Sequence, residues 1–121
     1  MAIKEIPNNP EAEQAVIGSM FLEENSLQKT CEVLNPEAFY FNNNAKIFGT
    51  IKDMAEKKVP IDLTTVTTEL KCRNILNEVG GVEYLTEILD SVATAANIDQ
   101  YVKSVEEAAL LRKLIEVSTN I

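Results

Sequence analysis

Histidine and tryptophan are both absent from this sequence of 121 residues. Without histidine the chain cannot build a Ser-His-Asp triad, a Cys-His pair or a typical zinc site. None of the four glycines is followed by Lys-Ser or Lys-Thr, and there is no GxGxxG pattern, so neither a Walker A loop nor a dinucleotide-binding turn is present. Carboxylate pairs such as Glu11 with Glu13 are more simply helix starts. We therefore expect no catalytic residue, no metal site and no bound cofactor.

Positive charge is also scarce. Eleven Lys and Arg residues face nineteen Asp and Glu residues, which gives a net charge of −8 that repels a phosphate backbone. Direct binding of nucleic acid is therefore not expected. The stretch 75–102 carries five acidic residues and no basic one. Such a stretch suits a basic partner, although a solvated acidic face explains it equally well.

Long apolar runs are missing too, because none approaches the roughly 20 residues needed to cross a bilayer. The first residues lack the apolar core of a signal peptide. The two cysteines, Cys31 and Cys72, lie far apart and form no CxxC motif, so we interpret them as ordinary reduced, buried thiols. These features predict a cytoplasmic protein with no membrane contact.

What the sequence does contain is a series of helix signals and no segment that must be a strand. Asn9 before Pro10, followed by Glu11 and Glu13, predicts a helix start, because Asn caps, Pro suits the first turn and carboxylates favour the dipole. Further helices are predicted from Asn25 (with Gln28 as a capping box), from Asn42–Asn44, from Asp62, from Val82 to Val92 and from Asn97. The fold class is therefore all-α, a small bundle of about five to six helices followed by a long C-terminal helix.

The expected core follows from the helical spacing of the apolar residues. Phe39, Tyr40 and Phe41 are expected to form an aromatic part of that core. The other inward-facing positions are Ala12, Val16, Met20, Leu27, Cys31, Leu34, Ile47, Phe48, Ile51, Met54, Leu63, Val66 and Leu70.

The last helix carries apolar residues on two sides. Starting at Asn97, it is long enough for about 36 Å at about 1.5 Å per residue. We divide the chain into a globular head, residues 1–96, and this helix, residues 97–121. Because one head cannot cover both sides, we expect self-association; the alternative is a helix that lies wholly on its own domain. One stripe is Tyr101, Val105, Ala108, Leu111 and Ile115, the other is Leu110, Leu114, Val117 and Ile121, and the self-association candidates are Leu110, Leu111, Leu114, Val117 and Ile121.

Two binding classes without enzymatic activity compete for this sequence. A helix-turn-helix reader of DNA needs a helix that concentrates basic side chains, whereas the lysines near Lys57 and Lys71 are diluted by acidic neighbours. A helical adaptor for protein interactions agrees better with the acidic charge and the doubly apolar last helix.

Six segments stand out by their order and spacing: residues 9–18, 36–40, 46–48, 60–66, 79–85 and 95–98 with Tyr101. Through these segments the chain resembles the N-terminal domain of bacterial replicative DNA helicases of the DnaB family. The resemblance covers about Ile6 to Ile121 and departs at Asn44, where the family often has His, and at Cys72-Arg73-Asn74, which replaces a glycine-containing turn.

The resemblance implies an assembly module of a larger enzyme in DNA replication. In that family the last helix here begins a dimerisation hairpin, and pairs of domains form a hexamer as a trimer of dimers. The RecA-like ATPase domain is absent from this sequence, so it is interpreted as a fragment, and ATP and Mg are expected only in that missing domain. The implied partner is the C-terminal domain of a DnaG-type primase.

We place the primase site at the turn formed by Gly80 and Gly81, the helix after it and the exposed side of the last helix. Tyr84 completes this site as an aromatic anchor if its side chain points outward, with Glu83 and Glu87 beside it; the alternative is that Tyr84 and Ile115 are core residues. Glu11 and Ile115 are the other candidates.

Overall fold

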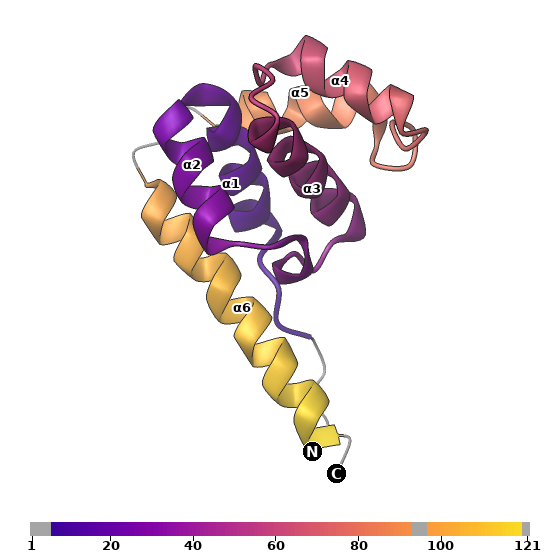
Figure 1. Ribbon diagram of the computed structural model, residues 1–121. Helices are drawn as coiled ribbons and strands as arrows, with labels where there is room; N and C mark the ends of the chain where they lie inside the picture. Colours follow the sequence, from indigo (N-terminus) through magenta and orange to yellow (C-terminus); the bar gives the residue numbers. More distant parts are fainter. Residues whose placement is uncertain (1–5, 93–96, 120–121) are drawn as a thin grey trace.

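Helices make up all the regular structure in residues 6–92 and 97–119, which are the residues that the computed structural model describes. The all-α prediction is confirmed. Figure 1 shows α1 to α5 gathered in a head, while the far half of α6 projects from it. The elements are α1 (Pro10–Leu22), α2 (Glu24–Val33), the short 3₁₀ helix η1 (Pro36–Ala38), α3 (Asn42–Glu56), α4 (Leu63–Cys72), α5 (Gly81–Ser91) and α6 (Ile98–Thr119).

The starts of α1 and α4 follow the capping signals in the sequence. Asn9 accepts a hydrogen bond from the backbone N–H of Ala12 at 3.0 Å, with Pro10 in the first helical position. Asp62 accepts from the N–H of Thr65 at 2.8 Å, and the Thr65 hydroxyl accepts from the N–H of Asp62 at 3.0 Å. Each cap pairs N–H groups that the first turn leaves without a helical partner.

The predicted start of α2 at Asn25 is wrong, because the connection from α1 is a single residue. The N–H of Glu23 donates to the carbonyl of Ser19 at 3.2 Å, and the carbonyl of Glu23 accepts from the N–H of Leu27 at 3.1 Å. Glu23 thus closes one helix and opens the next, which leaves Asn25 inside α2. Ser26 and Thr30 are the buried residues of this helix, whereas Leu27 and Cys31 are only partly buried.

The core surrounds α1, which packs against α2, α3, α5 and α6. Phe39 stacks on Phe48 with ring centroids 4.8 Å apart. Tyr40 was predicted to belong to this core, but it is 40% exposed. Its ring instead makes a T-shaped contact with the ring of Phe41. The buried apolar residues are Ala12, Val16, Ile17, Met20, Leu34, Phe39, Ile47, Phe48, Ile51, Met54, Val66, Leu70, Val79, Leu85, Ile88, Ile98, Val102 and Val105.

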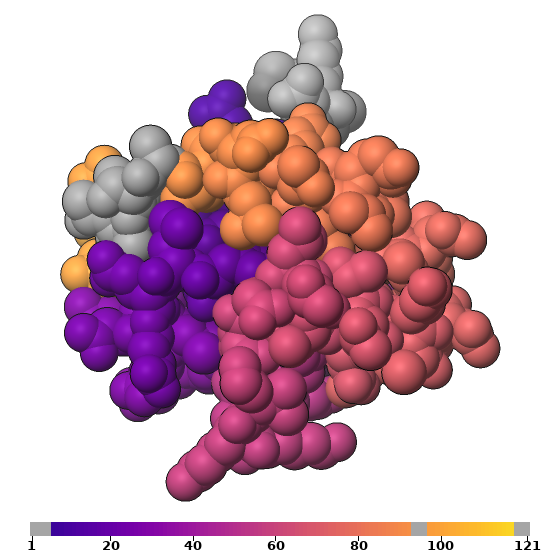
Figure 2. Space-filling view, turned by 90° about the horizontal axis from the view of Figure 1, so that it is seen from above, coloured from indigo at the N-terminus to yellow at the C-terminus, as the bar shows by residue number. Residues whose placement is uncertain are grey.

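The first half of α6 belongs to this core. Ile98, Val102 and Val105 are all buried, so the globular unit continues past the division expected at residue 96. Figure 2, viewed from above, shows segments far apart in the sequence meeting over one end of the head: the violet region of α2, the rose region of α4 and the orange region of α5. The helix that reaches outward is therefore anchored in the head by its own first turns.

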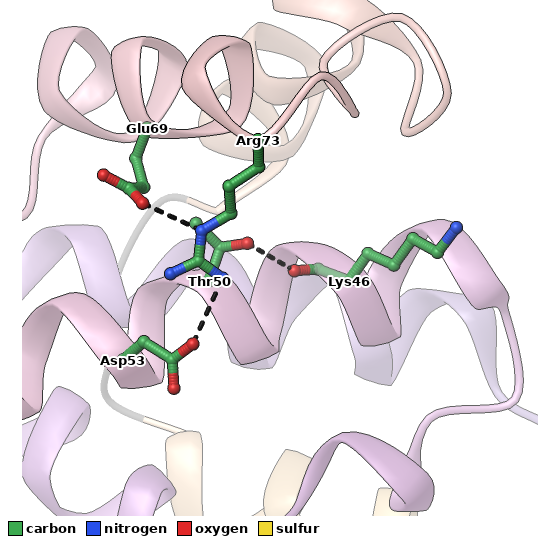
Figure 3. Close-up of polar contacts among 5 residues, drawn as sticks. All are labelled: Lys46, Thr50, Asp53, Glu69 and Arg73. Carbon is green, nitrogen blue, oxygen red and sulfur yellow. Dashed lines mark hydrogen bonds and ion pairs between the residues drawn. The ribbon is translucent and has the colours of Figure 1, made fainter.

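An ion-pair cluster joins α4 to α3 (Figure 3). The Arg73 guanidinium donates to Glu69 at 2.8 Å within the same helical stretch and to Asp53 of α3 at 3.1 Å. These hydrogen bonds, with Glu69 first, raise the pKa of Arg73. Because the three side chains are partly exposed, the cluster orients α4 more than it stabilises the fold.

Candidate interaction surfaces

The far half of α6 presents an apolar surface to solvent. Leu110, Leu114 and Val117, three members of the expected stripe, are 59%, 57% and 60% exposed. Leu111 is 50% exposed, although it continues the stripe that is buried at Val105. Ile121, the last candidate for self-association, lies outside the described residues. Four neighbouring large apolar side chains on one projecting helix are typical of a surface that another protein covers.

Arg112 lies on this same part of α6 but points toward the head. Its guanidinium donates to the carbonyl of Pro7 at 2.9 Å and to the carbonyl of Ala38 at 2.8 Å. It also lies over the ring of Tyr40, 5.3 Å from the centroid. Nothing in the local sequence distinguishes Arg112 from the other cations, because all three partners lie far away in the chain.

The outer face of α5 forms a second surface, which is acidic. Glu83, Glu87 and Asp90 are exposed and border a shallow hollow that also includes Val82, Thr86 and Ser91. None of the ion pairs found among residues 6–92 and 97–119 involves these three carboxyl groups. This face therefore carries unbalanced negative charge around a small apolar floor, where Val82 is 40% exposed.

Tyr84 does not belong to that exposed face. Its side chain is partly buried, and its hydroxyl donates to Asn44 of α3 and accepts from Gln14 of α1 at 3.4 Å. Burial raises the pKa of the Tyr84 phenol. The expectation of an outward-facing anchor is wrong, because the Tyr84 hydroxyl turns toward α1 and α3, where these two bonds hold it, whereas Glu87 on the same helix is exposed.

The remaining docking candidates lie on different elements. Glu11 is exposed in the first turn of α1, three residues before the Gln14 that reaches Tyr84, so it lies on the side of α1 near α5. Ile115 is partly buried in the far half of α6. The structure thus groups Glu83 with Glu87 on α5, while Glu11 lies on α1 and Ile115 on the far half of α6.

A buried acidic residue at the centre of the head was not anticipated. Glu13 is 2% exposed, and its side chain accepts hydrogen bonds from the backbone N–H of Tyr40 at 2.7 Å and of Phe41 at 3.4 Å. It also accepts from the Asn44 amide at 2.9 Å. Glu13 therefore holds the two residues just before α3, whose N-cap is Phe41 without a side-chain bond, while within the first turn Asn43 accepts from the N–H of Asn44 at 2.9 Å. The spacing of Glu13 from Val16, Ile17 and Met20 was the available signal.

The described residues offer little for chemistry. They contain no group of three or more His, Cys, Asp or Glu side chains placed to hold a metal ion. Both cysteines are free thiols; Cys72 is exposed and Cys31 partly buried, where burial raises its pKa. Among the described residues, no helix is both long and apolar enough to cross a membrane. The exposed surfaces of α5 and α6 are therefore the candidate functional sites among the described residues.

Comparisons with known proteins agree on one family. Residues 5–107 match the family described as the DnaB-like helicase N terminal domain. The chain is 48% identical over 115 residues to the replicative DNA helicase DnaC of Bacillus subtilis, which covers 95% of this chain but only 25% of that protein.

Solved structures give the same result. The N-terminal domain of DnaB helicase from Mycobacterium tuberculosis is similar, with a TM-score of 0.92 and 36% identity over 96% of this chain and 84% of that one. A DnaB-like replicative helicase, described together with its interactions with primase, has a TM-score of 0.81 and 31% identity over 93% of this chain and 26% of that one.

Proposed function

This chain belongs to the family of DnaB-like helicase N-terminal domains, and from that membership we propose that it is the assembly and primase-docking domain of a bacterial replicative helicase. The single observation that carries the assembly role is the uncovered apolar stripe on α6. The docking role is supported by the acidic face of α5 and by the primase interactions described for a structural relative.

In the proposed assembly, copies pair through the far half of α6. Leu110, Leu114 and Val117 recur at helical spacing, so a second apolar helix can cover them along one line. Pairs of this kind would build a hexamer as a trimer of dimers in the parent helicase.

The assembly role is tested with Leu114→Asp in sedimentation equilibrium. Since position 114 is exposed, the substitution should weaken self-association by at least about tenfold, as expected for a central apolar contact, and leave the melting temperature of the head unchanged. The matched control is Gln100→Asp, which adds the same charge at an exposed position near the start of α6, away from the stripe. A strictly monomeric wild type, or a Leu114→Asp variant that melts with the whole domain, contradicts the proposal.

For docking, the proposed partner surface is basic and belongs to the C-terminal domain of a DnaG-type primase. Glu83, Glu87 and Asp90 supply the complementary charge, and Val82 supplies the apolar contact. Glu11 borders this surface, while Ile115 would contribute only if primase also reached the far half of α6. With Tyr84 turned inward, charge rather than an aromatic anchor would dominate recognition.

The docking role is tested with the double variant Glu83→Lys/Glu87→Lys in titrations against the primase C-terminal domain. Affinity should fall at least about tenfold at low ionic strength, and the difference should shrink near 0.5 M salt, where the Debye length is only about 4 Å. Glu32→Lys/Glu107→Lys, which changes two exposed carboxylates on α2 and α6, is the charge-matched control. Equal affinities of the two double variants would refute this docking face.

Unwinding and ATP hydrolysis are assigned to a part of the helicase that this chain does not include. The chain spans a quarter of the length of its B. subtilis relative, and it has no Walker A sequence. With a net charge of −8, it should also bind single-stranded DNA no better than other acidic proteins do. ATP turnover by the purified chain above a mock preparation would contradict this assignment.

A further inference from the structure

Arg112 lies at the boundary between the two halves of α6. On one side, Val105 is buried in the head, and on the other, Leu114 is exposed to solvent. The Arg112 guanidinium holds this boundary through the carbonyls of Pro7 and Ala38 and through the Tyr40 ring. One side chain thus joins α6 to the segment before α1, to the last residue of η1 and to Tyr40 in the loop that follows.

The loop that Arg112 contacts is itself held from the opposite side. The N–H groups of Tyr40 and Phe41 donate to the buried Glu13 of α1. A continuous set of polar contacts therefore runs from the central helix α1, through residues 38–41, to Arg112 on α6. Because Glu13 is buried and α1 is the most enclosed helix, this loop is a firm anchor for the projecting helix.

We infer that Arg112 is a positioning residue for self-association: it fixes the direction in which the apolar stripe of α6 leaves the head. The inference rests on the proposed assembly role of that stripe. Arginine suits the task because its planar fork donates to two carbonyls at once while its face stacks on an aromatic ring, which a lysine ammonium cannot reproduce. Arg112 does not need to touch the second copy to influence pairing.

The physical effect is on the population of competent conformations. Two stripes can cover each other only when both helices leave their heads in matching directions. If only a fraction of the copies has the correct direction, the apparent dissociation constant rises by the inverse of that fraction. In a pair of identical copies the factor applies to each copy, so the two factors multiply. Loss of the Arg112 contacts should therefore weaken pairing while leaving the apolar side chains themselves unchanged.

The first test measures the direction of α6 in the isolated chain. Spin labels are placed on the native Cys72 of α4 and on Leu114→Cys, in a Cys31→Ala background that leaves one labelled thiol in the head. Pulsed electron paramagnetic resonance at low protein concentration then gives the distribution of distances between the two labels. We expect a clearly broader distribution in Arg112→Ala, a smaller broadening in Arg112→Lys, and none in Lys113→Ala, which removes a neighbouring exposed cation.

The second test measures association of the unlabelled chain by sedimentation equilibrium. Arg112→Ala should weaken pairing by roughly tenfold, as for a competent fraction reduced to about a third in each copy, with helix content by circular dichroism unchanged. Arg112→Lys should be intermediate and remains informative if Arg112→Ala does not fold. Lys113→Ala should match the wild type.

The two tests separate the inference from the proposed function. Wild-type distance distributions or wild-type association in Arg112→Ala and Arg112→Lys overturn the role of Arg112. If the wild type does not associate at all, the proposed assembly role fails, and the distance distributions alone still decide whether Arg112 holds α6.

Discussion

Helix α1 and the far half of α6 both carry apolar residues on more than one side, yet α1 is buried and the far half of α6 is exposed to solvent. In α1, Val16 and Ile17 are fully buried because α2, α3, α5 and α6 surround them. In α6, Leu114 and Val117 remain more than half exposed. A helix that is apolar all round must be covered on every side. For α1 the chain itself provides the cover, whereas for the far half of α6 the described residues do not.

The largest effect expected from this contrast is on stability. Ile17→Ala should lower the free energy of unfolding by about 3 kcal/mol, because the side-chain carbons beyond Cβ are lost from a fully buried site and a cavity remains. Leu114→Ala, the matched change on the exposed helix, should cost less than about 0.5 kcal/mol. Urea titrations of both variants measure the difference, and similar losses would mean that the two helices are not in different environments.

A second prediction concerns the polar side of α1. Glu13→Gln retains the shape of the side chain but replaces one acceptor oxygen with a donor, which must face either the N–H of Tyr40 at the Oε2 position or the donors of Phe41 and Asn44 at the Oε1 position. We expect a loss of about 2 kcal/mol, as for a buried acceptor removed from its donors. Glu11→Gln, at an exposed position in the same helix, should cost less than about 1 kcal/mol through the helix dipole. Equal losses in urea titrations would contradict the network around Glu13.

A third prediction sharpens the contrast through two helical glycines. In α1, a Cβ at Gly18 would lie 2.5 Å from Val92 Cγ2, so Gly18→Ala should cost about 1 to 2 kcal/mol by overpacking. In α3, a Cβ at Gly49 would meet only Pro36, at 3.4 Å, and Gly49→Ala should gain up to about 1 kcal/mol from helix propensity. Thermal melts of both variants test this, and stabilisation by Gly18→Ala would show that α1 is less tightly enclosed.

The smallest effect concerns Tyr84, which joins α5 to the enclosed side of α1. Tyr84→Phe should cost about 1 kcal/mol, since Asn44 loses its phenol donor. Burial raises the pKa of this phenol, so the stability that it contributes is present below the unfolded value of about 10 and is lost as the pH rises through the folded value.

The wild type should therefore lose more stability than Tyr84→Phe between roughly pH 9 and pH 11, the range around the tyrosine pKa of about 10 in the unfolded chain. Urea titrations at several pH values measure the gap, which should narrow as the pH rises. Tyr40→Phe, at an exposed tyrosine, is the control and should track the wild type. A gap that widens with pH would reverse the sign and contradict the burial of the Tyr84 hydroxyl.

Features with local causes could be predicted from the sequence. The caps at Asn9 and Asp62 involve partners three residues away, and the buried face of α3 follows from helical spacing. The exposure of the α6 stripe was predictable for the same reason. The start of α2 was missed because its N-cap, Glu23, makes no side-chain bond and is set by the end of α1, for which it is also the C-cap.

The partners of Tyr84, Glu13 and Arg112 could not be predicted in this way. Tyr84 bonds to a residue 40 positions away, and Arg112 bonds to Pro7 across 105 positions. Helical periodicity indicates which side of a helix is buried, but it does not indicate which other helix lies there. The acidic surface of α5 was anticipated from composition, and only the packing of α5 on α1 showed that Tyr84 is not part of it.

The central place of α1 also constrains the order in which the chain can mature on the ribosome. α1 is synthesised before the other helices described here, yet its cover includes Leu85 and Ile88 of α5 and Ile98, Val102 and Val105 of α6. A nascent chain that ends before Ile98 leaves one side of α1 without its neighbour, so the cooperative head is complete only after the first turns of α6 have emerged from the exit tunnel. Until then, the side of α1 that α6 covers in the complete head presents its apolar residues to solvent, as surface of the kind that chaperones bind.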